Sequence, residues 1–294
     1  MAFSWLNTLV SVVRCQVIDY LRKRGRNRYG TMKGKASRLT SGLVLKTGQH
    51  DAVSAELEAL SFVAAHTSIP VPRVRYHWQD KGDASVIMQF MEGEMLQRVW
   101  ADLSPAQRRH VMQTLSGFVD QLRLLSQPPP PSSLSHLPRE GWIGSTLGHS
   151  FHDASMTQEV AAFGPFASER QFYNWRVSRF DLLTWNADTA AKLADIRQRM
   201  RDDHPIVLTH GDINRRNVLV CVHGPEQEDV EVTALLDWEQ AGWRPIYWES
   251  RKWIFGNPKP REWADFALHG IGMGNNDDIQ LDTELQAISG HIPP

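Results

Sequence analysis

Three side chains in the C-terminal half have the types and spacing that phosphoryl transfer requires. The stretch Thr209–Asn217 reads Thr-His-Gly-Asp-Ile-Asn-Arg-Arg-Asn, and Asp237 follows twenty residues after Asn217. The carboxylate of Asp212 can accept the proton of a substrate hydroxyl, and an amide carbonyl oxygen can hold a metal ion. A second carboxylate at the end of a later strand can chelate Mg²⁺ between nucleotide phosphates. These residues therefore predict a reaction driven by positioning and charge neutralisation.

The histidine of this stretch completes a known spacing. His-x-Asp-x-x-x-x-Asn matches the catalytic loop of protein kinases, with Gly211 at the position where kinases carry arginine. We expect His210 to hold the loop through hydrogen bonds instead of acting as an acid or base. A metallohydrolase site made of His204, His210 and Asp212 is disfavoured because its ligand set is incomplete and leaves Asp237 unexplained.

The elements that must position these residues fall into two groups. Before Met91 the chain predicts two short strands within 36–46, a helix that begins at about Asp51 and stops before Ile69, and paired strands over 74–78 and 85–90. Later segments predict helices from Ser104-Pro105, over 168–180 and over 188–201, strands over 217–222 and 230–237, and a long ordered loop over 128–165. Everything after the last strand is expected to be helical or irregular.

With these motifs, the sequence resembles the aminoglycoside phosphotransferase/choline kinase family, in particular its fungal members, over roughly residues 36–260. The resemblance implies that Asp212 is the catalytic base and that Asn217 and Asp237 are the metal ligands. It also implies ATP and Mg²⁺ as cofactors. Gly141–Ser145 and Phe163–Phe166 resemble segments typical of the fungal members.

The same resemblance assigns nucleotide-binding residues before Met91. Lys46 ends a strand where the family places its ATP-phosphate lysine, and Glu58 falls at the family's distance before the Ile-Pro-Val-Pro segment, as the partner of Lys46. Glu56 is the rival for that role. Backbone groups of Gln89 and Met91 are expected to read the adenine edge.

The resemblance implies an α+β, two-lobed, protein-kinase-like fold. Residues 1–91 would form an N-terminal helix and a small β-rich lobe, residues 92–294 would form a larger, mainly helical catalytic and acceptor-binding lobe, and nucleotide would lie between them. The expected activity is that of a small-molecule kinase, which transfers the γ-phosphate of ATP to a hydroxyl of a small molecule. No Ala-Pro-Glu element follows Asp237, which favours a small acceptor over a protein.

One departure from kinase patterns keeps other functions open. No Gly-x-Gly-x-x-Gly precedes Lys46, and only Gly30 and Gly34 are candidates for a phosphate lid. The alternatives are a degenerate kinase-like protein that binds nucleotide or metabolite without transfer, and a secondary-metabolite pathway enzyme on the same fold.

Composition limits the partners and the compartment. The 294 residues carry 32 Lys+Arg and 33 Asp+Glu, a formal net charge of −1, which disfavours a nucleic-acid partner. Two distant cysteines give no disulfide framework, so a cytoplasmic location is expected. No stretch is apolar enough for an integral membrane segment. The apolar positions Trp5, Leu9, Val12 or Val13, Val17 and Leu21 predict an amphipathic helix docked on its own domain, with attachment to a membrane surface as the alternative. No pattern indicates the oligomeric state.

Several side chains near the predicted site have two interpretations. Arg215 and Arg216 can contact phosphate or be ordinary exposed loop residues. Glu239 and Glu249 can bind a cationic acceptor or pair with Arg244 and Arg251. Five of the eleven tryptophans fall within residues 238–263. They can form a cation–π cage for an amine or pack the large lobe, and packing accounts for most indoles without a ligand.

Overall fold

A computed structural model describes residues 2–32, 34–80, 82–156, 162–182, 187–256, 259–271 and 276–288. Its internal contacts separate two compact units. The first contains Met1–Val53 and Pro72–Met91, and the second contains Ser54–Val71 and Glu92–Pro294.

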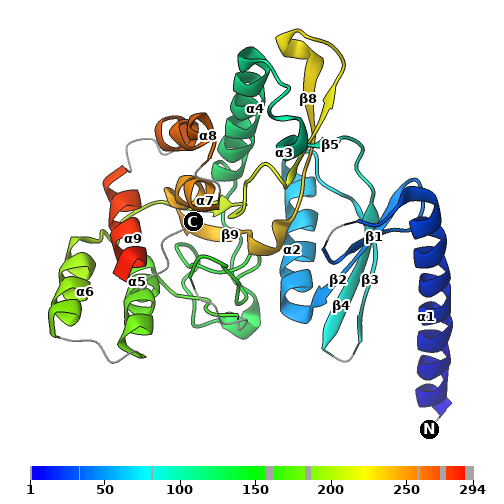
Figure 1. Cartoon of the computed structure of the whole chain (residues 1–294). Coiled ribbons are helices and arrows are strands. Elements are labelled where there is room, and N and C mark those ends of the chain that lie inside the picture. The colour runs from blue at the N-terminus through cyan, green and yellow to red at the C-terminus, as the bar shows by residue number, and fades with distance from the viewer. Residues whose placement is uncertain are drawn as a thin grey trace. The chain divides into compact units, whose positions relative to one another are not determined.

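The first unit is a helix on an antiparallel sheet. The sheet order is β1-β2-β4-β3, and the elements are α1 (Ala2–Tyr29), β1 (Ala36–Arg38), β2 (Leu43–Gln49), β3 (Val74–Asp80) and β4 (Asp83–Gln89). In Figure 1, α1 runs beside this sheet. The four strands lie where the sequence predicts them, because turn residues mark the boundaries between them.

Helix α1 packs through a face about one residue away from the predicted one. Ile18 is buried against Leu39 and Leu45, with Leu21 partly buried beside them. Val12, Val13 and Val17 are each about half exposed, so the predicted stripe is wrong at these positions. The side chains of Trp5 and Leu9 lie outside the described residues.

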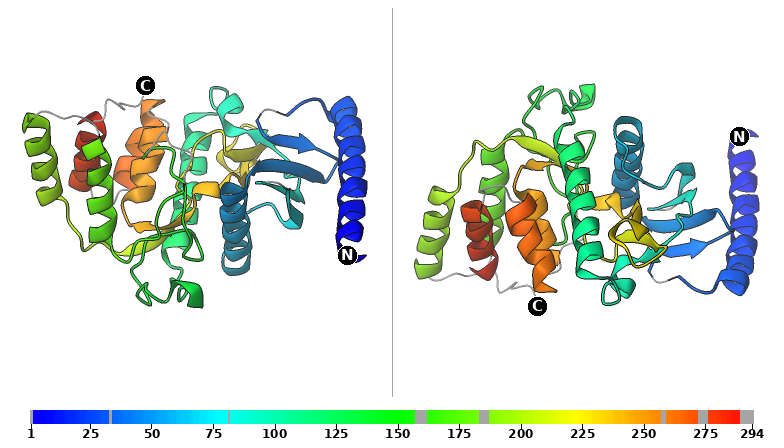
Figure 2. Two further views of the ribbon diagram at one scale, coloured as in Figure 1. Left: turned by 90° about the horizontal axis from the view of Figure 1, so that it is seen from below. Right: turned by 90° about the horizontal axis from the view of Figure 1, so that it is seen from above.

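The second unit holds most of the helices and two small sheets. Its helices include α2 (His50–His66, from Ser54 onward), α3 (Leu96–Val99), α4 (Pro105–Arg123), α5 (Glu169–Ser178), α6 (Ala187–Arg199), α7 (Trp248–Gly256), α8 (Arg261–Phe266) and α9 (Asn276–Ile288). One sheet has the order β5-β7-β8, with β5 (Glu94–Met95), β7 (Val218–Val222) and β8 (Val230–Leu235), and the other pairs β6 (Ile206–Thr209) with β9 (Gly242–Pro245). Helices α5, α6 and α9 lie side by side in Figures 1 and 2.

Part of the segment that the sequence assigns to the small lobe groups with the second unit. Ser54–Val71 belongs there because its side chains and backbone contact that unit. Phe62 lies edge-on to Trp243, with ring centroids 6.3 Å apart, and the N–H of Leu235 donates to the Pro70 carbonyl at 2.9 Å.

The long helix α4 begins as the sequence predicts. Ser104 caps it by accepting the N–H of Gln107, while the Gln107 side chain accepts the N–H of Ser104, and Pro105 occupies the first helical position. Its buried face includes Val111, Leu115 and other apolar residues at helical spacing. The segment after the last predicted strand differs from expectation, since residues Gly242–Pro245 form β9 and pair with β6.

Buried ion pairs join the helices of the second unit. Asp282 of α9 forms ion pairs with the guanidinium groups of Arg176 and Arg251. His204, whose side chain is 2% exposed, lies between Glu169 at 2.7 Å and Asp278 at 3.1 Å. Burial by itself lowers the pKa of His204, but these two carboxylates together raise it above its ordinary value.

The raised pKa of His204 leads us to expect that the stability of the protein depends on pH. A folded-state pKa above the unfolded value means that the stabilising contribution of His204 is complete below about pH 6.5, the unfolded value, and is lost as the pH rises through the folded pKa. We expect the free energy of unfolding to decline over that range, and His204→Gln to remove this part of the decline. Chemical denaturation at a series of pH values measures it, with His223→Gln, an exposed histidine, as the control. The same pH profile in His204→Gln and the wild type would contradict the prediction.

Candidate active site

The loop that carries Asp212 connects strand β6 to strand β7. Its tightest point is Gly211, which has φ +75°. A Cβ at that position would lie 2.7 Å from the carbonyl oxygen of Gln240. The close approach of this backbone explains why glycine stands where protein kinases carry arginine.

His210 has the structural role that the sequence predicts. Its Nδ1 accepts the backbone N–H of Asp212 at 3.1 Å, so Nε2 carries the proton and donates to the Leu236 carbonyl at 3.0 Å. Burial lowers the pKa of His210 to about 4. The imidazole is therefore neutral near pH 7 and ties the loop to the segment that ends at Asp237.

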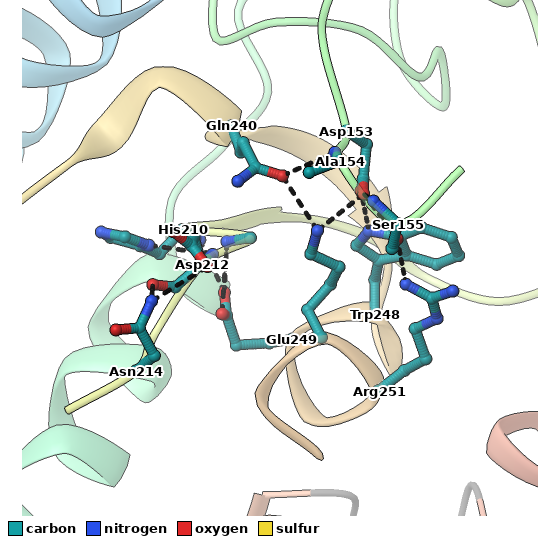
Figure 3. Close-up of polar contacts among 12 residues, drawn as sticks. Asp153, Ala154, Ser155, His210, Asp212, Asn214, Gln240, Trp248, Glu249 and Arg251 are labelled. Carbon is teal, nitrogen blue, oxygen red and sulfur yellow. Dashed lines mark hydrogen bonds and ion pairs between the residues drawn. The ribbon is translucent and has the colours of Figure 1, made fainter. Parts of the chain in front are cut away.

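The Asp212 carboxylate is held by two amides of its own loop. Asn217 Nδ2 donates to Oδ2 at 2.8 Å, and Asn214 Nδ2 donates to Oδ1 at 3.0 Å. Burial raises the pKa of Asp212 to about 6, against the lowering effect of the Lys252 ammonium. Figure 3 shows Asp212 and Asn214 beside His210 and Glu249. The two amide donors thus fix the orientation of the Asp212 carboxylate, while burial limits how strongly its charged form is stabilised.

A buried carboxylate on α7 holds the loop of Asp212 through backbone hydrogen bonds. Glu249 is 1% exposed, and its Oε2 accepts the N–H of His210 at 2.6 Å. The N–H of Gly211 donates to the same carboxylate at 3.2 Å. Burial raises the pKa of Glu249 to about 7, while these backbone donors lower it. The hydrogen bonds of Glu249 therefore go to backbone groups, a role that neither sequence interpretation anticipated.

Asp237 lies at the end of β8 in a conformation unusual for a residue with a side chain. Its φ of 68° and ψ of 66° are left-handed, and it directly precedes the short helical turn Trp238–Gln240. Aspartate is among the few residues that adopt this region, at some energetic cost. His210 is close enough for the negative charge of Asp237 to raise its pKa, against the larger effect of burial. The carboxylate of Asp237 therefore lies near the loop that carries Asp212.

The donor set fits a magnesium ion. Because Asn217 Nδ2 donates to Asp212, the amide oxygen of Asn217 faces the other way and stays available as a ligand. Amide and carboxylate oxygens are hard ligands, and Mg²⁺ usually takes only one or two protein ligands beside phosphates and water. Among the described residues, no cluster of three or more His, Cys, Asp or Glu side chains could hold a metal ion.

The predicted nucleotide-binding residues lie in different units. Lys46 is in β2, opposite Val86 of β4. The carboxylate of Glu58, in the second unit, accepts a hydrogen bond from Ser145 Oγ at 2.8 Å and lies 2.7 Å from His149 Nδ1. Glu56, its rival as the partner of Lys46, is the more buried of the two, at 3% exposure. Pairing of Lys46 with either carboxylate stays a prediction.

The predicted adenine contacts and phosphate lid lie in the first unit. Gln89 ends β4, and its N–H donates to the Arg73 carbonyl at 2.9 Å. Met91 is the last residue of this unit. Gly30 has φ +79° and donates its N–H to the Arg26 carbonyl, so it terminates α1. That role accounts for Gly30 without a phosphate.

The two loop arginines have different partners, and only Arg215 is bound away from Asp212. Arg215 donates from Nη2 to the Lys259 carbonyl at 2.9 Å, and its guanidinium lies 5.4 Å from the centre of the Trp100 ring. The backbone N–H of Arg216 donates to Asn214 Oδ1 at 2.9 Å. The contacts of Arg215 support a structural role over a phosphate contact.

The C-terminal tryptophans form core and not a cage. Trp238, Trp243, Trp248, Trp253 and Trp263 are each 0% exposed. The cations over Trp248 are the chain's own Arg176 and Arg251, at 5.0 and 4.8 Å from the ring centre. An aromatic cage for a substrate amine, one of the two sequence interpretations, is therefore wrong.

The sequence did not point to three polar residues that lie near the loop of Asp212. Asp153, Gln240 and Lys252 come from separate segments and meet through hydrogen bonds of 2.6 and 2.9 Å to the Lys252 ammonium. Figure 3 shows Gln240 and Asp153 on the side of the site opposite Asn214. The only sequence signal was that Lys252 lies three residues after Glu249, on the same face of a helix.

Comparison with solved structures finds the same fold among aminoglycoside phosphotransferases. The enzyme APH(2")-IIa in complex with gentamicin is 13% identical, with a TM-score of 0.56, over 94% of this chain and 90% of that chain. Aminoglycoside-3'-phosphotransferase of type VIII is 16% identical, with a TM-score of 0.50, over 92% and 99%. APH(3")-Id from Streptomyces rimosus is 16% identical, with a TM-score of 0.50, over 88% and 91%. No curated protein matches the sequence.

Fold and sequence together define the class. The α+β fold is that of the protein-kinase-like phosphotransferases, as the sequence resemblance implied. The chain belongs to the phosphotransferase enzyme family, whose model matches residues 38–270. Within the described residues, no helix combines the length and apolar character needed to cross a lipid bilayer.

The buried Glu249 gives a stability prediction. Glu249→Ala leaves the N–H groups of His210 and Gly211 without their acceptor, which we expect to lower the free energy of unfolding by about 3 kcal/mol. Glu249→Gln keeps an acceptor oxygen and should lose less. Denaturant titration measures both variants, with the exposed Glu231→Ala as the control. Equal stability of Glu249→Ala and the wild type would refute an anchoring role.

Proposed function

We propose that this protein transfers the γ-phosphate of ATP, with Mg²⁺, to a hydroxyl group of a small molecule. The observation that carries the proposal is the Asp212 carboxylate, oriented through Oδ1 by Asn214 and through Oδ2 by Asn217 on a loop anchored by Glu249. Membership of the phosphotransferase family supports the reaction type.

In the proposed step, Asp212 accepts the proton of the acceptor hydroxyl as that oxygen attacks the γ-phosphorus. A new oxygen–phosphorus bond forms, the bond from the γ-phosphorus to the bridging oxygen breaks, and ADP leaves with that oxygen. His210 stays neutral and holds the loop, since burial keeps its pKa at about 4. Lys46 would bind the α- and β-phosphates, and Glu58 or Glu56 would orient it.

Asn217 and Asp237 would hold the metal through an amide oxygen and a carboxylate. Bound Mg²⁺ would neutralise the charge of the nucleotide phosphates. Asp237 follows β8 and has a left-handed backbone conformation, directly before the helical turn Trp238–Gln240. The indole N–H of Trp238 donates to the Leu235 carbonyl at 2.9 Å and so ties this turn to β8.

A small acceptor is supported by the connection after Asp237. Residues 238–247 contain only a short helical turn and strand β9 before α7 begins at Trp248. Such a connection lacks the long activation segment with which protein kinases bind their protein substrates. Gentamicin is bound by one structural neighbour, so aminoglycosides belong in an acceptor screen beside amino alcohols, sugars and amino acids.

Nucleotide binding is tested by thermal stabilisation. We expect ATP with Mg²⁺ to raise the melting temperature, because a ligand at 100 times its Kd stabilises the folded state by about 2.7 kcal/mol. Asp237→Ala and chelation of Mg²⁺ should each remove the metal-dependent part of the shift. Asp237→Gly is the matched control for backbone strain, since glycine accepts φ 68° freely, and it should also lose the shift. No metal-dependent shift in the wild type would refute the proposed function.

Turnover is tested at the proposed base. Asp212→Ala should lower the rate of ADP release by roughly 10²–10⁴-fold, because the acceptor proton has no base, while the ATP–Mg²⁺ shift persists. Asp188→Ala, at an exposed position of α6, is the control and should keep the wild-type rate. A coupled assay for ADP over the acceptor screen gives the readout.

The same assay separates the alternatives. A metal-dependent thermal shift without ADP release for any acceptor would favour the degenerate binding protein. ADP release that Asp212→Ala does not reduce would place the chemistry elsewhere. Phosphorylated products identified by mass spectrometry would separate simple kinase activity from a further step, such as a dehydration, in a biosynthetic pathway.

A further inference from the structure

A buried lysine lies close to the proposed base, near enough for its charge to act on the Asp212 carboxyl. Lys252 belongs to α7, one helical turn after Glu249, and its side chain is 4% exposed. Lysine is rarely buried to this extent, because its ammonium loses strong hydration. Its position therefore needs a reason beyond packing.

The ammonium is held by two other segments. Its Nζ donates to Asp153 Oδ1 at 2.6 Å and to Gln240 Oε1 at 2.9 Å. Asp153 is itself fixed, since Oδ1 also accepts the N–H of Ser155 at 2.9 Å and Oδ2 accepts the Trp248 indole N–H at 3.2 Å. The side-chain oxygen Oε1 of Gln240 also accepts the backbone N–H of Ala154, at 3.1 Å. The charge is thus placed by fixed groups, as a preorganised electrostatic contact requires.

Two bonds leave one donor of this ammonium for another group. An ammonium carries three N–H bonds, and the described part of the chain supplies acceptors for two of them. The third N–H can serve an oxygen that the protein does not provide.

Lys252 is also the cation that acts most strongly on Asp212. Burial is the main effect on that carboxyl and raises its pKa, and the Lys252 ammonium opposes it. Burial is the main cause that lowers the pKa of His210, and the positive charge of Lys252 lowers it further. A positive charge that acts on both catalytic-loop residues lies near the place where charge develops on a transferring phosphoryl group.

We infer that Lys252 is a further catalytic residue, whose third N–H binds an oxygen of the phosphoryl group during its transfer to the acceptor hydroxyl at Asp212. The inference rests on the proposed function. Lys252 keeps its proton throughout, and the bonds that form and break are those of the transfer itself. Asp153 and Gln240 are its positioning residues.

The competing explanation is structural: Lys252 only neutralises Asp153 and so holds the loop that contains it. The double variant Asp153→Asn/Lys252→Met separates the two, because it removes both charges and leaves no buried unpaired carboxylate. A structural role predicts that the double variant recovers the rate lost in Lys252→Met. A catalytic role predicts that it does not.

The experiment measures slow ADP release from ATP–Mg²⁺ with water as the acceptor, together with the ATP–Mg²⁺ thermal shift. We expect Lys252→Met to lower kcat by about 10²-fold, with an unchanged KM for ATP and an unchanged shift. Lys252→Arg should retain more activity than Lys252→Met, and Asp153→Asn/Lys252→Met should stay as slow as Lys252→Met. The control is Lys192→Met, an exposed lysine of α6.

Each outcome decides between these explanations. An unchanged kcat in Lys252→Met, or recovery in the double variant, overturns the inference and leaves the proposed function standing. If Lys252→Met does not fold, the double variant and Lys252→Gln, which keeps donors but no charge, give the same comparison. Absence of both ADP release and a thermal shift in the wild type is instead the failure of the proposed function.

Discussion

The candidate site depends on one buried carboxylate that binds backbone amides. Glu249 accepts the N–H groups of His210 and Gly211 and thereby fixes the turn that presents Asp212. Buried donors and acceptors are costly when unpaired, so the loop and α7 constrain each other. The constraint extends along α7, because Lys252, one turn later, binds Asp153 and Gln240 from two further segments.

Close packing around the loop of Asp212 explains residues that have no direct role in the proposed reaction. Gly211 is required where the Gln240 carbonyl approaches the loop, and neutral His210 joins the loop to Leu236 just before Asp237. Trp238 fills the space under the turn after Asp237, with its indole N–H bonded to Leu235. The tryptophan-rich segment is therefore the packed support of the site, and its indoles carry no ligand surface.

Much of the fold was predictable because its signals are local. Ser104 with Pro105 marks the start of α4, and the short runs before Met91 give four strands at the predicted places. The strand β9 was not predictable, since Gly242–Pro245 has no alternating pattern and becomes a strand only by pairing with β6. The buried face of α1 was misplaced because apolar side chains also occur on exposed surface, as Val12, Val13 and Val17 do here.

The sequence by itself determined the family, the reaction type that it implies, and the spacing of Asp212, Asn217 and Asp237, because these depend on residue types at fixed separations. Only the tertiary structure decided the roles of Glu249 and Lys252. Their partners are backbone amides and side chains 12 to 99 residues away in the chain, and charge alone does not say which of these a buried group will bind. A glutamate that looks like a substrate contact in sequence becomes an anchor when burial brings two N–H groups to it.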